Sequence, residues 1–135
     1  MTKLEEIKNI LHEKDASLVV CFANGEVKEY YNDRIIDIKN ILLEDEKALN
    51  GAIVADKVIG KTAGALLAVG GVKEVYADVM SSLIIPIFEE NNIKYEYREK
   101  VDYIVNKDKT GMCPMENKYK DVKDIKEIYN TVLSK

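Results

Sequence analysis

The spacing of apolar residues changes along this chain, and the change predicts which segments form helices and which form strands. In three segments apolar residues recur every three or four positions, the period of a helix with one buried face. Short continuous apolar runs lie between Gly, Asn and charged residues and are typical of buried strands. The predicted elements, in chain order, are a helix at 2–14, strands at 17–23 and 27–32, a helix at 35–49, a strand at 51–55, a helix at 57–69, a strand at 72–80, a helix at 81–92, a strand at 93–97 and a helix at 121–133.

Turn residues indicate how these elements connect. Asn24-Gly25 favours a tight hairpin, so the first two strands are expected to be antiparallel. Gly70-Gly71 ends one helix, and Pro86 lies in the early turns of the next, where proline is tolerated. The later strands alternate with helices, and right-handed crossovers make such strands parallel. The pattern predicts an α/β fold with one mixed sheet between layers of helix, as a single domain over 1–135.

Composition narrows the classes of partner. The chain of 135 residues has 24 acidic and 20 basic residues, and only two of the basic residues are Arg. A net charge of −4 and few Arg disfavour nucleic acid as a partner. No apolar run reaches the length of a membrane span, and the first residues do not resemble a secretory leader. We therefore expect no membrane partner, a cytoplasmic location and no disulfide between Cys21 and Cys113.

The segment Ala55–Thr62 fits the loose form of a phosphate-binding P-loop, Ala-x-x-x-x-Gly-Lys-Thr. A working P-loop needs a flexible, glycine-rich backbone around the phosphates. Here the loop positions include the β-branched Val58 and Ile59, and the anionic Asp56 stands where phosphates would lie. "VYAD" at 75–78 resembles a Walker B strand, but any buried strand that ends in Asp matches equally. The chain is not expected to be a P-loop NTPase.

The same segment has a second interpretation as the start of a helix. Asp56 is predicted to cap a helix that contains Lys57, Gly60 and Lys61. The two lysines are four residues apart, near a helix end that is already positive, which is slightly unfavourable. They are either solvated side chains or the ligands of an anion. An anion would fit because ligands of α/β sheets bind beyond the carboxyl ends of parallel strands.

Three segments carry a resemblance to a known family: "GAIVADKVIGKTAGALL", "GGVKEVYADVMS" and "IVNKDKTGMCPME". Together they resemble an uncharacterised bacterial family, a domain of unknown function with the cytidine-deaminase-like fold. The resemblance covers about residues 15–118, the expected core of the domain. It implies a three-layer α/β/α sandwich around a five-stranded mixed sheet, here with an added N-terminal and an added C-terminal helix. It implies no known reaction.

Zinc deaminases need His or Cys two residues before a Glu at one helix start, and Pro-Cys-x-x-Cys at the next. In the corresponding positions this chain has "DKVIGK" and "MSSLIIP", without His or Cys. We therefore expect no zinc-dependent deaminase activity, no metal and no cofactor. The one histidine, His12, falls off the apolar face of the first helix and is predicted to be a solvated surface residue.

The segment around Cys113 is a second candidate site. Pro114 suits the first position of a helix, which makes Cys113 its N-cap and places Glu116 like the acid of a capping box. Cys113 is either a small buried residue that fixes a loop, or a thiol activated by the helix N-terminus. Cys113 and Glu116 are the candidate catalytic residues.

The leading hypothesis is a protein that binds a small anionic or nucleotide-like ligand in a cleft between helix N-termini. Ser81 and Ser82 either cap a helix at this cleft or bind an oxyanion. The alternatives are a catalytically inert scaffold that self-associates, as a homodimer, and a reactive-thiol protein that uses Cys113. Whether any reaction is catalysed stays open. The predicted ligand-binding residues are Asp56, Lys57, Gly60, Lys61, Ser81, Ser82, Cys113 and Glu116.

Overall fold

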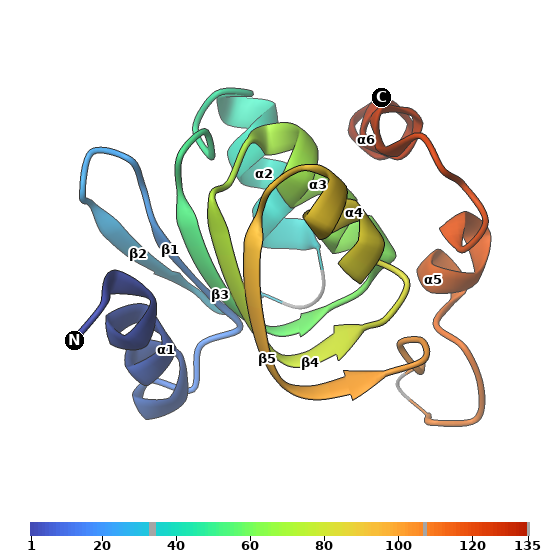
Figure 1. Ribbon diagram of the computed structural model, residues 1–135, viewed down its shortest axis with the longest axis horizontal. Coiled ribbons are helices and arrows are strands. Elements are labelled where there is room, and N and C mark those ends of the chain that lie inside the picture. Colours follow the sequence, from blue (N-terminus) through green and yellow to red (C-terminus); the bar gives the residue numbers. More distant parts are fainter. Residues whose placement is uncertain (33–34, 107, 135) are drawn as a thin grey trace.

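The computed structural model describes residues 1–32, 35–106 and 108–134. They form an α/β protein with a five-stranded sheet in the order β2-β1-β3-β4-β5 (Figure 1). The elements are α1 (Lys3–Glu13), β1 (Leu18–Cys21), β2 (Val27–Tyr30), α2 (Ile36–Glu44), β3 (Ile53–Ile59), α3 (Lys61–Gly70), β4 (Glu74–Ser81), α4 (Ile85–Glu90), β5 (Lys94–Val101), α5 (Pro114–Tyr119) and α6 (Ile125–Leu133).

The sheet is mixed, as predicted. β1 and β2 form an antiparallel hairpin that pairs Leu18 with Tyr30, and Gly25 in its turn has a φ of 93°. β1 is also antiparallel to β3, whereas β3, β4 and β5 are parallel to one another. The carboxyl ends of the three parallel strands therefore lie at one edge of the sheet, where ligands of α/β proteins usually bind.

Helices cover both faces of the sheet (Figure 1). α1 packs on one face through Leu4, Ile7 and Leu11, which belong to a cluster with residues of β1, β3 and β4. The other face carries α2, α3 and α4, and α6 packs on the outer side of α3. α3 thus lies between the sheet and α6, which explains why its sequence is apolar or small on all sides.

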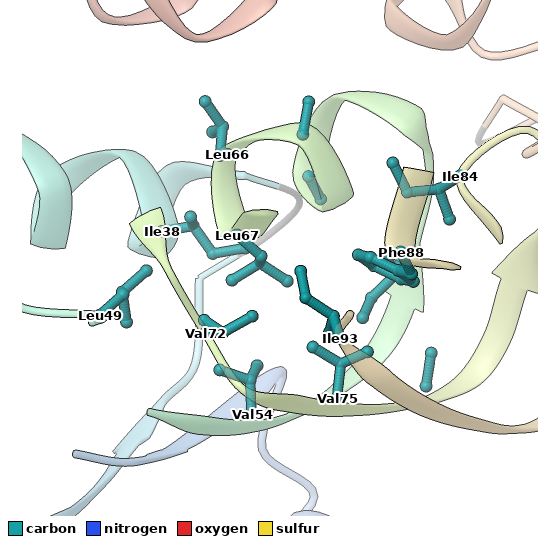
Figure 2. Close-up of a cluster of buried hydrophobic side chains, with 14 of the residues drawn as sticks. Ile38, Leu49, Val54, Leu66, Leu67, Val72, Val75, Ile84, Phe88 and Ile93 are labelled. Atoms are coloured by element: carbon teal, nitrogen blue, oxygen red, sulfur yellow. The ribbon is translucent and has the colours of Figure 1, made fainter. Parts of the chain in front are cut away.

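The larger core lies under α3 (Figure 2). Val54 and Val75 point up from the sheet, Leu67 comes down from α3, and Phe88 enters from α4 (Figure 2). Val54, Val75, Leu67 and Phe88 have no exposed surface. Val54 lies two residues before Asp56, so this packing fixes the part of β3 that carries Asp56.

The structure differs from the sequence-based prediction at the boundary between β3 and α3, which carries several candidate site residues. The strand predicted at 51–55 continues to Ile59, and the helix predicted from residue 57 begins at Lys61 with Gly60 as its N-cap. The β-branched Val58 and Ile59 extend β3 because they pair with Val79 and Met80 of β4. The prediction that Asp56 caps a helix is therefore wrong.

The second boundary error concerns the serines. β4 runs to Ser81, and α4 begins only at Ile85, so neither Ser81 nor Ser82 is the N-cap of the helix predicted at 81–92. The Ser81 hydroxyl accepts a hydrogen bond from Leu83 N at 3.2 Å in the intervening turn. Pro86 does lie in the first turn of α4, as predicted.

The three parallel strands bend at the same level (Figure 1). The register pairs Asp56 with Ala77 and Val58 with Val79, but it is interrupted between them, and the pairing of β4 with β5 is interrupted at the same residue of β4. Beyond the bend, Ile59 joins the core beneath the helices. The bend separates Asp56, inside the sheet, from the start of α3.

We expect Gly64→Ala in α3 to destabilise the fold, because a Cβ at this position would overlap the Cγ1 atom of the buried Ile84. Overpacking costs about 1–3 kcal/mol, which outweighs the gain of about 1 kcal/mol in helix propensity. Urea unfolding measures the loss. The double variant Gly64→Ala/Ile84→Ala should lose less than the sum of the single losses, and strict additivity would show that these residues do not collide.

Candidate functional site

A cavity of about 450 Å³ lies at the carboxyl end of β3. Its walls are formed by the first residues of α2 and of α3, by α5, and by the segment before α5. Ile36, Val58 and Val105 line it and are each more than 40% exposed, so the cavity opens to solvent. The apolar wall consists mainly of Ile36, Val58, Ala63, Ile104, Val105 and Met115, and its polar side chains include Asp56, Thr62, Cys113 and Glu116.

Asp56 is the buried acid of this cavity. It lies in the middle of the sheet, between Leu18 of β1 and Ala77 of β4, and is only 7% exposed. Its Oδ1 accepts a hydrogen bond from Val58 N at 3.2 Å. Burial raises the pKa of Asp56 to about 8, although backbone hydrogen bonds oppose the shift and the Asp37 carboxylate adds to it. At neutral pH the side chain is therefore mostly a neutral carboxylic acid.

The two lysines do not form the predicted pair on one helix face. Lys57 lies in β3, and its ammonium forms an ion pair with the Asp15 carboxylate. Lys61 is the first residue of α3, and its Nζ donates to the carbonyl oxygen of Lys120 at 3.0 Å. Burial lowers the pKa of Lys61. The predicted arrangement of two helical lysines around one anion is wrong because β3 is longer than expected.

An internal carboxylate lies at the N-terminus of α3. Glu116 Oε1 accepts from Lys61 N at 2.7 Å, and Oε2 accepts from Ile104 N at 2.8 Å. The side chain is only 2% exposed. Gly60 permits this approach, since a Cβ there would lie 3.0 Å from both Glu116 Oε1 and Ile104 Cγ1. The negative charge that the sequence assigned to a ligand at this helix end is supplied by the chain itself.

Cys113 and Pro114 occupy the predicted positions at the start of α5, the N-cap and the first helical residue. The capping box is not formed, because Glu116 bonds to α3 and to the segment before α5, while Cys113 N donates to Ile104 O at 2.8 Å. Cys113 is 6% exposed and lines the cavity. The reactivity of its thiol stays a prediction.

Five of the eight predicted ligand-binding residues line the cavity, namely Asp56, Lys57, Gly60, Cys113 and Glu116. Lys61, Ser81 and Ser82 are not part of its wall. Ser82 instead donates from its hydroxyl to Asp102 O at 3.2 Å. The cleft expected between the starts of two helices is thus bounded by α2 and α3, and α4 takes no part in it.

The sequence did not single out the apolar wall. Ile104 and Val105 lie in a stretch predicted to be irregular, and Val105 forms an isolated antiparallel bridge with Met112. The signal was present, since apolar residues in a polar loop after the last strand need a surface to pack on. Thr62, the last residue of the P-loop-like segment, also lines the cavity.

A second polar cluster lies on the face covered by α1. His12 Nε2 is 2.7 Å from Asp78 Oδ1, and the Tyr76 hydroxyl donates to the same oxygen at 2.5 Å. Burial opposes ionisation of Asp78, but the hydrogen bonds from Tyr76 and His12, together with the charges of His12 and Arg98, lower its pKa. His12 is an exposed surface residue, as predicted, but its ring also contacts Asp78 and so joins α1 to β4, which the sequence did not predict. This contact is long-range and has no local sequence signal.

Within residues 1–32, 35–106 and 108–134, no three His, Cys, Asp or Glu side chains are grouped as ligands for a metal ion. In that same part of the chain, no helix combines the length and hydrophobicity of a membrane span.

Fold and site together define an α/β protein with a mostly apolar cavity at the carboxyl end of a mixed sheet. Residues 6–135 match the TM1506 family, described as a domain of unknown function (DUF1893), and the chain belongs to this family. The family resemblance noted in the sequence is thereby confirmed at the level of an uncharacterised family.

A crystal structure of a DUF1893 family protein (TM1506) from Thermotoga maritima, at 2.70 Å resolution, is similar to this chain, with a TM-score of 0.87 and 28% sequence identity. The match covers 99% of this chain and 91% of that one. No curated protein matches the sequence.

We expect Glu116→Gln to weaken the attachment of Ile104 and the start of α5 to α3. The amide group of Gln would place a donor against one of the two N–H groups, and a buried unsatisfied donor costs about 1–3 kcal/mol. Urea unfolding should show this loss, and hydrogen exchange should quicken at the amides of Lys61 and Ile104. Glu127→Gln, at an exposed position, is the matched control. Unchanged exchange at both amides would contradict the role of Glu116.

We expect the free energy of unfolding to fall as pH rises from about 5 to 8, because folded Asp56 keeps a proton that the unfolded chain releases. The slope from this group is at most about 1.4 kcal/mol per pH unit. Asp56→Asn removes it, so the variant should gain stability relative to the wild type as pH rises. Urea unfolding at several pH values measures the difference, with the exposed Asp108→Asn as control. Parallel pH curves for wild type and Asp56→Asn would show that folded Asp56 is already ionised at neutral pH.

Proposed function

We propose that this DUF1893 protein binds a small, mostly apolar molecule in the cavity at the end of β3, with Asp56 as its polar anchor. The observation that carries the proposal is a buried carboxyl group in the wall of an open apolar cavity. A polar group in such a place is costly unless something hydrogen-bonds to it. A ligand would use the hydrogen-bonding capacity that remains on Asp56 beside its bond from Val58 N, and would cover the exposed apolar wall at the same time.

The dimensions of the cavity support this proposal. Its volume of about 450 Å³ lies within the range of about 300–1,000 Å³ that is usual for small-molecule sites. Such sites combine apolar walls with a few polar groups that fix the ligand's orientation. Here the polar groups include Asp56, Thr62 and Cys113.

The sequence favoured an anionic ligand, and the geometry favours one without net negative charge. Lys57 is the one cation among the described lining residues, and its ammonium is paired with Asp15. Glu116 already occupies the helix end that would attract an anion. An incoming anion would therefore meet carboxyl groups without a compensating positive charge, which costs free energy.

We further propose that the fold belongs to the cytidine-deaminase-like class. A five-stranded mixed sheet with helices on both faces supports this, because it is the architecture that the sequence resemblance implies. A nucleoside-like ligand without phosphate is compatible with the cavity, but fold alone does not identify a ligand or a reaction.

Binding can be tested with the uncharged aromatic probes indole and benzamide. Methyl resonances of Thr62, Ala63 and Met115, which line the cavity, should shift during titration, with saturation at millimolar or lower probe concentration. Val105→Trp, at the rim, should fill the cavity and abolish the shifts. Val27→Trp, on the edge strand β2 and outside the cavity, is the matched control and should bind like the wild type.

The proposal fails if the cavity methyl groups do not respond to either probe up to its solubility limit. It also fails if Val105→Trp binds as well as the control variant, since the probes would then occupy another surface.

A further inference from the structure

The charged groups around the cavity indicate which chemical class of ligand the proposed binding function involves. We propose that the natural ligand is cationic, with an amine or amidine group that pairs with Asp56 and an apolar body against the cavity wall. This inference rests on the proposed function, and it adds a charge to the ligand.

The protein surrounds Asp56 with acidic groups. Asp37 on α2 and Asp78 on β4 both disfavour a further negative charge at Asp56. Glu116 on α5 lines the same cavity. A positive charge brought in by a ligand would be attracted by all of these groups.

The nearby cations are engaged elsewhere. The Lys57 ammonium pairs with Asp15, so that pair adds no net charge at the cavity. The Lys61 ammonium donates to Lys120 O and is not part of the wall. Among the described residues, neither Asp56 nor Glu116 forms a salt bridge, and Glu116 is held instead by two backbone N–H groups.

Hydrogen bonding distinguishes the two acids of the cavity. Both oxygens of Glu116 accept short backbone hydrogen bonds. Asp56 accepts a longer bond, from Val58 N to Oδ1, and the backbone N–H of Lys57 also favours its charged form. A carboxylate has about four lone-pair sites, so Asp56 retains capacity for the N–H groups of a ligand. Amidine and carboxylate form paired, charge-assisted hydrogen bonds of the kind that Arg makes.

Protons must move when such a ligand binds. Asp56 is mostly protonated at neutral pH because it is buried. A cation favours its ionised form, so the carboxyl group releases its proton to solvent as the ion pair forms. Affinity for a cation should therefore rise with pH until Asp56 is ionised in the free protein, by up to about tenfold per pH unit.

Benzamidine, benzamide and benzoate test the inference, because they share one shape and differ in charge. Calorimetric titration of the full chain at pH 6, 7, 8 and 9 should show benzamidine binding at least about tenfold more tightly than benzamide at pH 9, with affinity rising from pH 6. Near pH 7, titrations in buffers of different ionisation enthalpy should show release of about one proton per benzamidine. Benzoate should bind most weakly.

Asp56→Asn is the discriminating variant, since Asn keeps the size of the side chain and cannot ionise. It should bind benzamide with little change, lose the preference for benzamidine and lose the pH dependence. Asp108→Asn, exposed and outside the cavity, is the control.

The outcomes separate the two proposals. If benzamide binds in the cavity and benzamidine binds no more tightly at any pH, the cationic ligand is refuted and the binding function stands. If Asp56→Asn keeps the preference for benzamidine, the cation pairs with another group and the inference is overturned. If no compound of the series binds, both proposals are refuted.

Discussion

The Glu116 carboxylate joins the first N–H group of α3 to the N–H group of Ile104, and the cavity depends on this contact. The two donors come from segments that are far apart in the sequence. Without Glu116, both would lose a buried acceptor, at a cost of about 1–3 kcal/mol each. Because the contact holds Ile104 and the start of α5 against the start of α3, Ile104, Val105 and Cys113 lie in the wall of the cavity.

The same contact explains the resemblance of Ala55–Thr62 to a P-loop. A phosphate site needs free N–H groups at a helix start and a glycine that lets the anion approach. Both features are present, at Lys61 N and at Gly60. Here the anion is the carboxylate of Glu116. The sequence pattern therefore reflects the same placement of an anion at a helix start as in a P-loop, and it does not indicate the same ligand.

Local signals predicted the order of elements well. Asn24-Gly25 correctly predicted the hairpin, and the spacing of Leu4, Ile7 and Leu11 predicted the buried face of α1. The end of β3 was missed because the lysine-rich segment after Asp56 was interpreted as a helix start. The β-branched pair Val58 and Ile59 was the better signal. Because of this one boundary error, the sequence-based prediction placed Lys57 and Lys61 on one helix, whereas Lys57 lies in β3 and Lys61 begins α3.

Long-range contacts account for what sequence reasoning could not supply. The bond from Glu116 to α3 and the contact of His12 with Asp78 join residues that no periodicity relates. The candidate cavity could be placed at the carboxyl end of the parallel strands, since topology fixes that edge. Its apolar wall could not be placed, because Ile104 and Val105 are positioned by the bonds of Ile104 with Glu116 and Cys113 and by the bridge of Val105 with Met112.

The two acidic residues of the cavity, Glu116 and Asp56, affect the stability of the fold in opposite directions. Glu116 accepts a backbone hydrogen bond on each of its two oxygens, so its carboxylate is part of the structure. Asp56 is held in the sheet by its neighbours Leu18 and Ala77, and burial keeps it protonated at neutral pH. Burial of an acid without a counter-ion opposes stability, as the direction of its pKa shift shows. We propose recognition at Asp56 because this buried carboxyl group lies in the wall of an open cavity and keeps hydrogen-bonding capacity beside its bond from Val58 N.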